Sequence, residues 1–148
     1  MSPALEKFRA QSKLFTLLDE AGQERLLAVA IPQTHPAGAA IVTQGDAGDA
    51  VFVVSEGSLE VVVADQEKRR TVATLGRGAF FGEIAALLGE SRSATVTAVT
   101  PVSLIRFEMP KVQGIIKDYP TVRQVLTKLA LKRSEDNLAE AMKDFSTD

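Results

Sequence analysis

The 148-residue sequence predicts an α+β fold in which an antiparallel barrel or sandwich lies between two helical segments. Six short runs rich in β-branched residues, spread over residues 39–108, alternate with turn signals. Many short strands at this spacing are typical of antiparallel barrels and sandwiches. The flanking segments instead carry helix caps and helical apolar spacing. A chain of this length can bury roughly 70% of its unfolded surface, so we expect one domain over residues 1–148.

The first zone, residues 1–36, is predicted to be helical. Asp19 is a candidate N-cap, because its short carboxylate can accept a hydrogen bond from the first turn of a helix. The apolar face of that helix is supplied by Leu26, Leu27, Val29 and Ala30. Pro32 and Pro36 end the zone. His35, which directly precedes Pro36, is expected in an exposed loop.

The second zone, residues 37–108, is predicted to hold the strands. The expected strands are Ala39–Gln44, Ala50–Ser55, Gly57–Ala64, Arg70–Leu75, Ser93–Val99 and Val102–Glu108. Turn-forming stretches separate them, among them Gly45–Asp49 and Asp65–Lys68. Residues 83–88 interrupt the strands with good helix formers that stop at Gly89. A short helix inside a β region is unusual, and it points to a functional site there.

The third zone, residues 110–143, is predicted to be helical again. Pro110 can open a first helix, which Tyr119 and Pro120 interrupt. Thr121 is a candidate cap for the longer helix that follows. The apolar stripe of that helix consists of Val122, Val125, Leu126, Leu129, Leu138 and Met142. This stripe can pack on the strands or form a homodimer, and the sequence does not separate the two.

The composition excludes several classes of site. The absence of Cys excludes disulfides, thiolate zinc sites, iron–sulfur clusters and Cys nucleophiles, and it fits a reducing, cytoplasmic location. One His leaves no His pair for a metal. Paired catalytic carboxylates are not excluded by counting, but no spacing supports them, so we expect no catalysis and no metal cofactor. The 17 basic and 19 acidic residues argue against direct nucleic-acid binding, and no apolar run approaches the roughly 20 residues of a membrane span.

The stretch from Phe80 to Val96 has the features of a phosphate site. Gly82 allows a ligand to approach the backbone just before the short helix. The helix N-terminus offers unpaired N–H groups and a positive dipole end, and Arg92 can return a guanidinium to the same anion. Glu83 can accept hydrogen bonds from a sugar hydroxyl. Together these groups favour a ligand with a phosphate and a hydroxyl at sugar-like separation.

Each of these features also has a purely structural explanation. Arg92 can be a surface residue after a turn, and Glu83 can simply favour the helix dipole. Residues 76–78 together with Gly82 faintly imitate a dinucleotide fingerprint. A dinucleotide site is not expected, however, because no βαβ unit follows.

The segment Phe81-Gly82-Glu83-Ile84-Ala85, followed by Gly89 and Arg92–Val96, resembles the phosphate-binding cassette of cyclic nucleotide-binding domains. Such domains occur in the regulatory subunit of protein kinase A, in bacterial catabolite activator protein and in cyclic-nucleotide-gated channels. The resemblance covers about Leu14 to Arg133. It implies an antiparallel β-roll of the double-stranded β-helix or jelly-roll-like kind, with a helical lead-in, a cassette at residues 80–96 and two C-terminal lid helices.

The resemblance also implies a role for each site residue. Glu83 would bind the ribose 2′-hydroxyl, and Arg92 would pair with the cyclic phosphate. Backbone groups or a hydroxyl would be added by Gly82, Ile84, Ala85, Ser93 and Ala94, and apolar walls by Val61 and Ala73. Arg133 would lie flat on the purine, although a solvated helix-face Arg is the alternative; Leu129, Lys132, Asp136 and Asn137 are further candidates. Ser91 stands where many members carry Pro, so we expect a looser loop before Arg92.

The ligand implied is cAMP, with cGMP as the alternative, because Ser93 does not decide the base. The function implied is that of a non-catalytic regulatory sensor, in which binding moves the C-terminal helices. Its effector domain or partner protein is not identifiable from the sequence. We expect neither a helix-turn-helix after Lys143 nor a pore before Leu14. A β-roll that binds no nucleotide and serves in protein interaction remains a second hypothesis.

Overall fold

The computed structural model describes residues 3–82, 89–125 and 128 of the chain. In this part, the helices α1 (Pro3–Gln11), α2 (Lys13–Thr16) and α3 (Glu20–Ala28) precede the strands. The strands are β1 (Ile31–His35), β2 (Ala40–Val42), β3 (Ala50–Glu56), β4 (Leu59–Asp65), β5 (Lys68–Leu75), β6 (Phe80–Phe81), β7 (Thr95–Ala98) and β8 (Val102–Glu108). Helix α5 (Met109–Ile116) follows β8, and residues 120–125 are helical. No helix among the described residues has the length and hydrophobicity needed to cross a bilayer.

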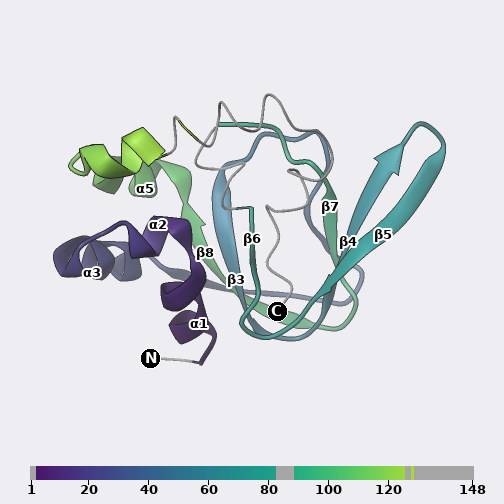
Figure 1. Cartoon of the computed structure of the whole chain (residues 1–148). Helices are drawn as coiled ribbons and strands as arrows, with labels where there is room; N and C mark the ends of the chain where they lie inside the picture. Colours follow the sequence, from purple (N-terminus) through teal and green to yellow (C-terminus); the bar gives the residue numbers. More distant parts are fainter. Residues whose placement is uncertain (1–2, 83–88, 126–127, 129–148) are drawn as a thin grey trace.

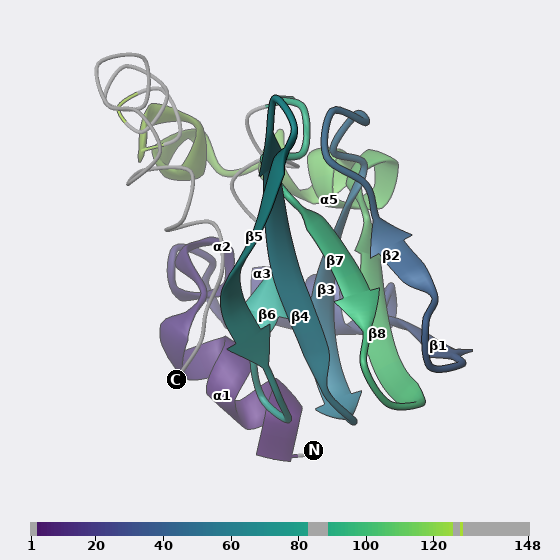
Figure 2. The same ribbon diagram turned by 90° about the vertical axis from the view of Figure 1, so that its right-hand side faces the viewer.

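These strands form two antiparallel sheets of four strands each (Figures 1 and 2). One sheet has the order β1-β8-β3-β6 and the other the order β2-β7-β4-β5. An apolar cluster with members from both sheets, including Val54, Leu104, Val61 and Val96, fills the space between them. The predicted α+β fold with an antiparallel β-roll is therefore confirmed, in the form of two packed sheets rather than one closed barrel.

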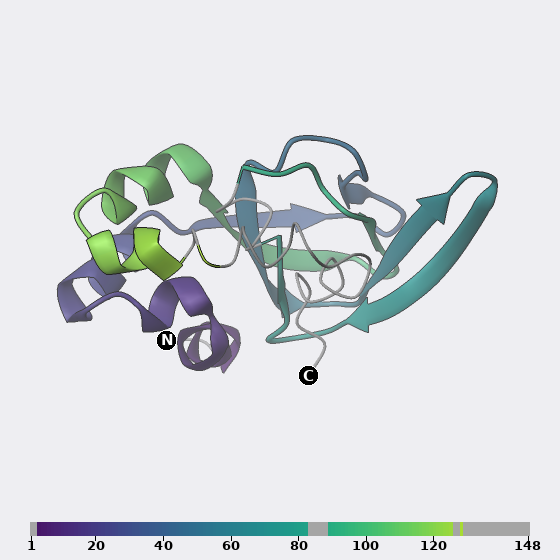
Figure 3. The same ribbon diagram turned by 45° about the horizontal axis from the view of Figure 1, so that its top comes forward.

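The β1-β8-β3-β6 sheet has a second buried face, which the helices cover (Figure 3). Successive side chains of a strand point to opposite faces. Val51 and Val53 of β3 accordingly join the helix-side cluster, whereas Phe52 and Val54 join the cluster between the sheets. This explains why β3 reads as a continuous apolar run rather than an alternating one.

Helix α1 is attached to the sheet mainly through Phe8, which is fully buried. Its ring stacks on Phe107 of β8 at 5.3 Å between centroids. It also makes edge contacts with Phe15 at 5.8 Å and Phe80 at 5.4 Å. One side chain thus joins α1, α2, β6 and β8, because aromatic edge and offset contacts are favourable in this distance range.

Two predictions for the first zone are wrong. Residues 31–35, expected to end a helical zone, form strand β1, and His35 lies half-buried at its end rather than in an exposed loop. Pro32 suggested a break, but a strand at the edge of a sheet tolerates Pro, because one side of it needs no ladder hydrogen bonds. β1 is such an edge strand, paired only with β8 within its sheet.

The third zone begins as predicted. Pro110 lies in the first turn of α5, in agreement with its fixed φ and missing N–H. Pro120 is already helical, so Thr121 lies inside the next helix and does not cap it. Pro120 suits this first turn because, like Pro110, it has a fixed φ and no N–H to leave unpaired. Val122 is fully buried and joins the helix-side cluster. The predicted stripe from Leu126 onward lies outside the described residues.

We expect Phe8→Ala to lower the free energy of unfolding by about 3–5 kcal/mol, the usual cost of deleting a buried Phe ring. Urea denaturation followed by circular dichroism would measure it. Val99→Ala is the control, because Val99 is exposed and surface truncations usually change stability by less than about 0.5 kcal/mol. Equal effects of the two substitutions would contradict the role of Phe8 in attaching α1.

Candidate functional site

The segment that carries Arg92 is held against the turn at residues 45–48. The Arg92 N–H donates to the Asp46 carbonyl at 2.7 Å, and the Gly45 N–H donates to the Arg92 carbonyl at 2.9 Å. Ser91 forms an antiparallel bridge with a residue of the same turn. These backbone hydrogen bonds restrain the segment before Arg92; the looser loop expected from Ser91 stays a prediction.

The Arg92 side chain is buried, with 5% of the residue exposed. Its Nη1 donates to the Gly82 carbonyl at 3.2 Å, and its Nη2 donates to the Ala50 carbonyl at 2.7 Å. Nη2 also lies 3.8 Å from Oδ1 of Asp49. A buried guanidinium is tolerated only where acceptors surround it. Arg92 thus joins the end of β6, the start of β3 and the preceding turn.

Gly82 is required at its position for two reasons. Its φ is +81°, a conformation that L side chains rarely adopt. A Cβ at this position would also collide with Nη1 of Arg92 and lie 3.1 Å from the Ala50 carbonyl oxygen. The backbone and the guanidinium can therefore approach each other only because the residue has no side chain.

Ser93, the next residue along, contributes a buried hydroxyl. Its Oγ is shielded from solvent and has no hydrogen-bond partner among the described residues. Such a hydroxyl costs free energy unless something pairs with it, so it is available to a ligand oxygen. Ala94 follows at 1% exposure and belongs to the cluster between the sheets.

The two predicted apolar wall residues lie together. Val61 of β4 pairs directly with Ala73 of β5 and, on its other side, with Val96 of β7. Directly opposed residues of antiparallel strands project to the same face of a sheet. Val61 is fully buried in the cluster between the sheets, and Ala73 packs against that cluster. Both therefore lie on the inner face of the β-roll.

Several predicted site residues lie outside the described residues. They are Glu83, Ile84 and Ala85 of the expected cassette helix and Arg133 of the last helix, together with the further base-contact candidates Leu129, Lys132, Asp136 and Asn137. Their roles remain predictions. Sequence reasoning also missed Asp49, which it treated only as part of a turn. It missed Arg106 too, although an Arg two residues after Leu104 interrupts the apolar face of β8.

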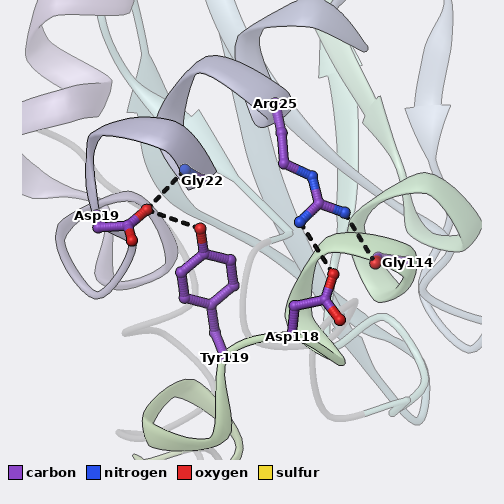
Figure 4. Close-up of polar contacts among 6 residues, drawn as sticks. All are labelled: Asp19, Gly22, Arg25, Gly114, Asp118 and Tyr119. Carbon is purple, nitrogen blue, oxygen red and sulfur yellow. Dashed lines mark hydrogen bonds and ion pairs between the residues drawn. The ribbon is translucent and has the colours of Figure 1, made fainter.

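A polar clasp joins α3 to the junction after α5 (Figure 4). Oδ1 of Asp19 accepts from the Gly22 N–H at 2.8 Å, which confirms the predicted N-cap. The same oxygen accepts from the Tyr119 hydroxyl at 2.7 Å. Arg25 donates from Nη1 to Oδ2 of Asp118 at 3.1 Å and from Nη2 to the Gly114 carbonyl at 3.2 Å. We call Asp19, Arg25, Asp118 and Tyr119 the α3 clasp.

The clasp changes the acidity of both members of its shortest contact. The Tyr119 hydroxyl, followed by the Gly22 N–H, holds the pKa of Asp19 below its ordinary value, because both hydrogen bonds favour the carboxylate. The Asp19 carboxylate in turn raises the pKa of Tyr119, because it accepts a hydrogen bond that only the neutral phenol can donate. Tyr119 is the only Tyr in a chain without Trp, so its titration reports on the clasp alone.

Comparison with known proteins decides the family. The model of the cyclic nucleotide-binding domain matches residues 32–119, more than half of the chain. The chain belongs to the cyclic nucleotide-binding domain family. A cyclic nucleotide-gated potassium channel of Mesorhizobium japonicum is 42% identical over 101 residues, which are 68% of this chain and 27% of the channel. The chain thus spans about a quarter of that relative's length.

Solved structures of similar proteins share the fold. The regulatory domain of Toxoplasma gondii PKA, crystallised with cAMP, superposes with a TM-score of 0.71 at 30% identity, covering 83% of this chain and 47% of that one. Catabolite activator protein of Thermus thermophilus superposes with a TM-score of 0.65 at 30% identity, covering 84% of this chain and 59% of that one. The resemblance read from residues 80–96 is therefore confirmed at the level of the family.

We expect Gly82→Ala to destabilise this cyclic nucleotide-binding domain more than Gly38→Ala. Both glycines have a positive φ, +81° and +88°, so both substitutions carry the backbone cost of roughly 1–2 kcal/mol. Only Gly82 adds a collision with Arg92, since nothing lies within 4 Å of a Cβ at Gly38. Thermal and urea unfolding would compare the two. A Gly38→Ala effect as large as that of Gly82→Ala would contradict the close approach of Arg92.

Proposed function

We propose that this domain is a regulatory sensor that binds cAMP in preference to cGMP and does not itself catalyse a reaction. The observation that carries the proposal is the buried guanidinium of Arg92, followed in the chain by Ser93, whose buried hydroxyl has no hydrogen-bond partner within residues 3–82, 89–125 and 128. A cation and a hydroxyl in consecutive positions suit one singly charged phosphate. The cAMP in the crystallised Toxoplasma regulatory domain supports that nucleotide.

The rest of the site follows from the family. Glu83 would accept hydrogen bonds from the ribose 2′-hydroxyl, and the backbone of Gly82, Ile84 and Ala85 would surround the ribose and phosphate. Val61 and Ala73 lie on the inner face of the β-roll, where an apolar wall can exclude water from the ligand. Arg133 would cover the purine.

The proposed coupling is a shift between two populations of the C-terminal helices. The α3 clasp connects α3 to the junction at Asp118 and Tyr119, directly before the helix that would cover the base. We propose that closure of this helix draws the junction away from α3. The nucleotide can then shift the equilibrium only by its difference in affinity for the two arrangements.

We expect Arg92→Ala to weaken cAMP binding by about 2–5 kcal/mol, the range for removing one member of a buried charge pair. Calorimetric titration of nucleotide-free protein with cAMP and then cGMP would measure this loss and the preference between the bases. Arg77→Ala is the control, because Arg77 forms an exposed ion pair with Glu56. Tight binding by Arg92→Ala would overturn the site. No heat from folded wild-type protein would indicate an interaction domain without nucleotide.

A second experiment tests the coupling. Absorbance titration of Tyr119 is expected to show an elevated pKa in the free protein, and a pKa nearer its ordinary value once cAMP draws the phenol from Asp19. The Asp19 carboxylate raises the pKa of Tyr119 because it favours the neutral phenol. Asp19→Asn removes this carboxylate, so the Tyr119 pKa of that variant is the reference for an open clasp. A Tyr119 titration that cAMP leaves unchanged would refute the movement of the junction.

A further inference from the structure

Asp49 lies between two arginines, only one of which belongs to the predicted phosphate site. Its Oδ1 is 3.8 Å from Nη2 of Arg92, and its Oδ2 is 3.6 Å from Nη2 of Arg106. Arg106 is part of β8, two residues beyond Leu104, whose side chain belongs to the cluster between the sheets. Residues two apart in a strand share a face. Arg106 therefore places a cation on the same face of β8 as Leu104.

A second set of contacts links Arg106 to the start of the cassette. Its guanidinium carbon lies 5.8 Å from the centroid of the Phe52 ring, and Phe52 is its register partner on β3. Phe52 stacks on Phe81 at 5.1 Å with an interplanar angle of 15°. Phe81 directly precedes Gly82, whose carbonyl accepts from Arg92. Arg106 thus reaches Arg92 by two routes, one through Asp49 and one through this aromatic pair.

The surroundings explain why Asp49 needs a second cation. Asp49 is largely exposed, at 69% for the side chain, and it lines a hollow of about 410 Å³ that also contains Arg92 and Arg106. A single ion pair fixes an exposed carboxylate only weakly, because water competes for the charge and the side chain loses rotamer freedom. Arg106 is better shielded, at 27% exposure, and its Nη2 also lies 3.9 Å from Oε2 of Glu108. It can therefore hold the other oxygen of Asp49 in place.

We propose that Arg106 is a positioning residue for Arg92 and acts mainly through Asp49. It does not touch the ligand. By fixing Asp49, and by supporting Phe52 under Phe81, it keeps the Arg92 guanidinium in one orientation. An ordered guanidinium loses less conformational freedom when a phosphate binds, so affinity rises. The inference rests on the proposed nucleotide site, but the orientation of Arg92 can be tested without nucleotide.

The first experiment measures cAMP affinity in Arg106→Gln, which removes the charge and keeps much of the length. We expect a loss of roughly three- to tenfold, typical of coupling between neighbouring residues. Arg106→Lys should restore part of it, because Lys keeps the charge but lacks the planar fork. Arg77→Gln, in an exposed ion pair with Glu56, is the matched control and should leave affinity unchanged.

A double-mutant cycle with Asp49→Asn separates positioning from a general structural effect. In the Asp49→Asn background, Arg106→Gln should cost less than about twofold, because the main route to Arg92 is already broken. An equal loss in both backgrounds, or no loss in either, would overturn the proposal. Melting temperatures of all variants would identify any loss that comes from unfolding.

A nucleotide-free measurement keeps the test separate from the proposed function. In protein with ¹⁵N-labelled arginine, the Arg92 side-chain resonance, assigned with Arg92→Lys, should shift and broaden in Arg106→Gln and much less in Arg77→Gln. An unchanged Arg92 resonance would refute positioning even if nucleotide binds. If Arg106→Gln changes the Arg92 resonance but the wild-type protein binds no cyclic nucleotide, the proposed ligand is refuted and the positioning role stands.

Discussion

The burial of one guanidinium is the constraint on which the site depends. Moving a charge out of water is unfavourable unless acceptors and counter-charges replace the solvent. Arg92 obtains them from the carbonyls of Gly82 and Ala50 and from the carboxylate of Asp49. These groups come from two separate places in the chain, residues 49–50 and residue 82, so the β-roll must bring both to Arg92 before the charge can be buried. The same requirement explains why residue 82 lacks a side chain.

The β3–β8 pair connects this site to the helices. Because the two strands are buried on both faces, alternate residues serve two different clusters. Phe52 and Arg106 lie on the side of the site, whereas Val53 and Phe107 lie against the helices. A packed core transmits displacement rather than absorbing it. In the proposed coupling, these two strands would give a change at Arg92 a path to the helices.

The parts of the structure that could be predicted are those set by local chemistry. The β-branched runs predicted most strands, and the short carboxylate of Asp19 predicted the cap of α3. The family followed from the resemblance of residues 81–85, 89 and 92–96 to a known cassette. Strand β1 was not predicted because its only partner within its sheet, β8, lies about 70 residues later in the sequence, at the end of the β region. The Asp19–Tyr119 bond likewise joins residues 100 positions apart.

Asp49 and Arg106 escaped for a different reason. A carboxylate in a turn and an Arg in a strand are each unremarkable, and only the register of β8 on β3 brings their charges together. One signal was nevertheless present, since an Arg at an inward-facing strand position implies a counter-charge. The roles of Glu83, Ile84, Ala85 and Arg133 remain predictions, because these residues lie outside the part of the chain that the structure describes.

The charge balance of the site bears on which phosphates it suits. The chain has a net charge of −2, so attraction of an anion must come from groups within a Debye length of about 8 Å. Near the site, two arginines face the carboxylate of Asp49, with Glu108 at the edge beside Arg106. These two arginines and two carboxylates balance, so Arg92 alone supplies the positive charge offered to an anion in the proposed site. A terminal phosphate carries close to two negative charges at neutral pH, whereas a cyclic phosphodiester carries one, which is the charge that the Arg92 guanidinium would pair.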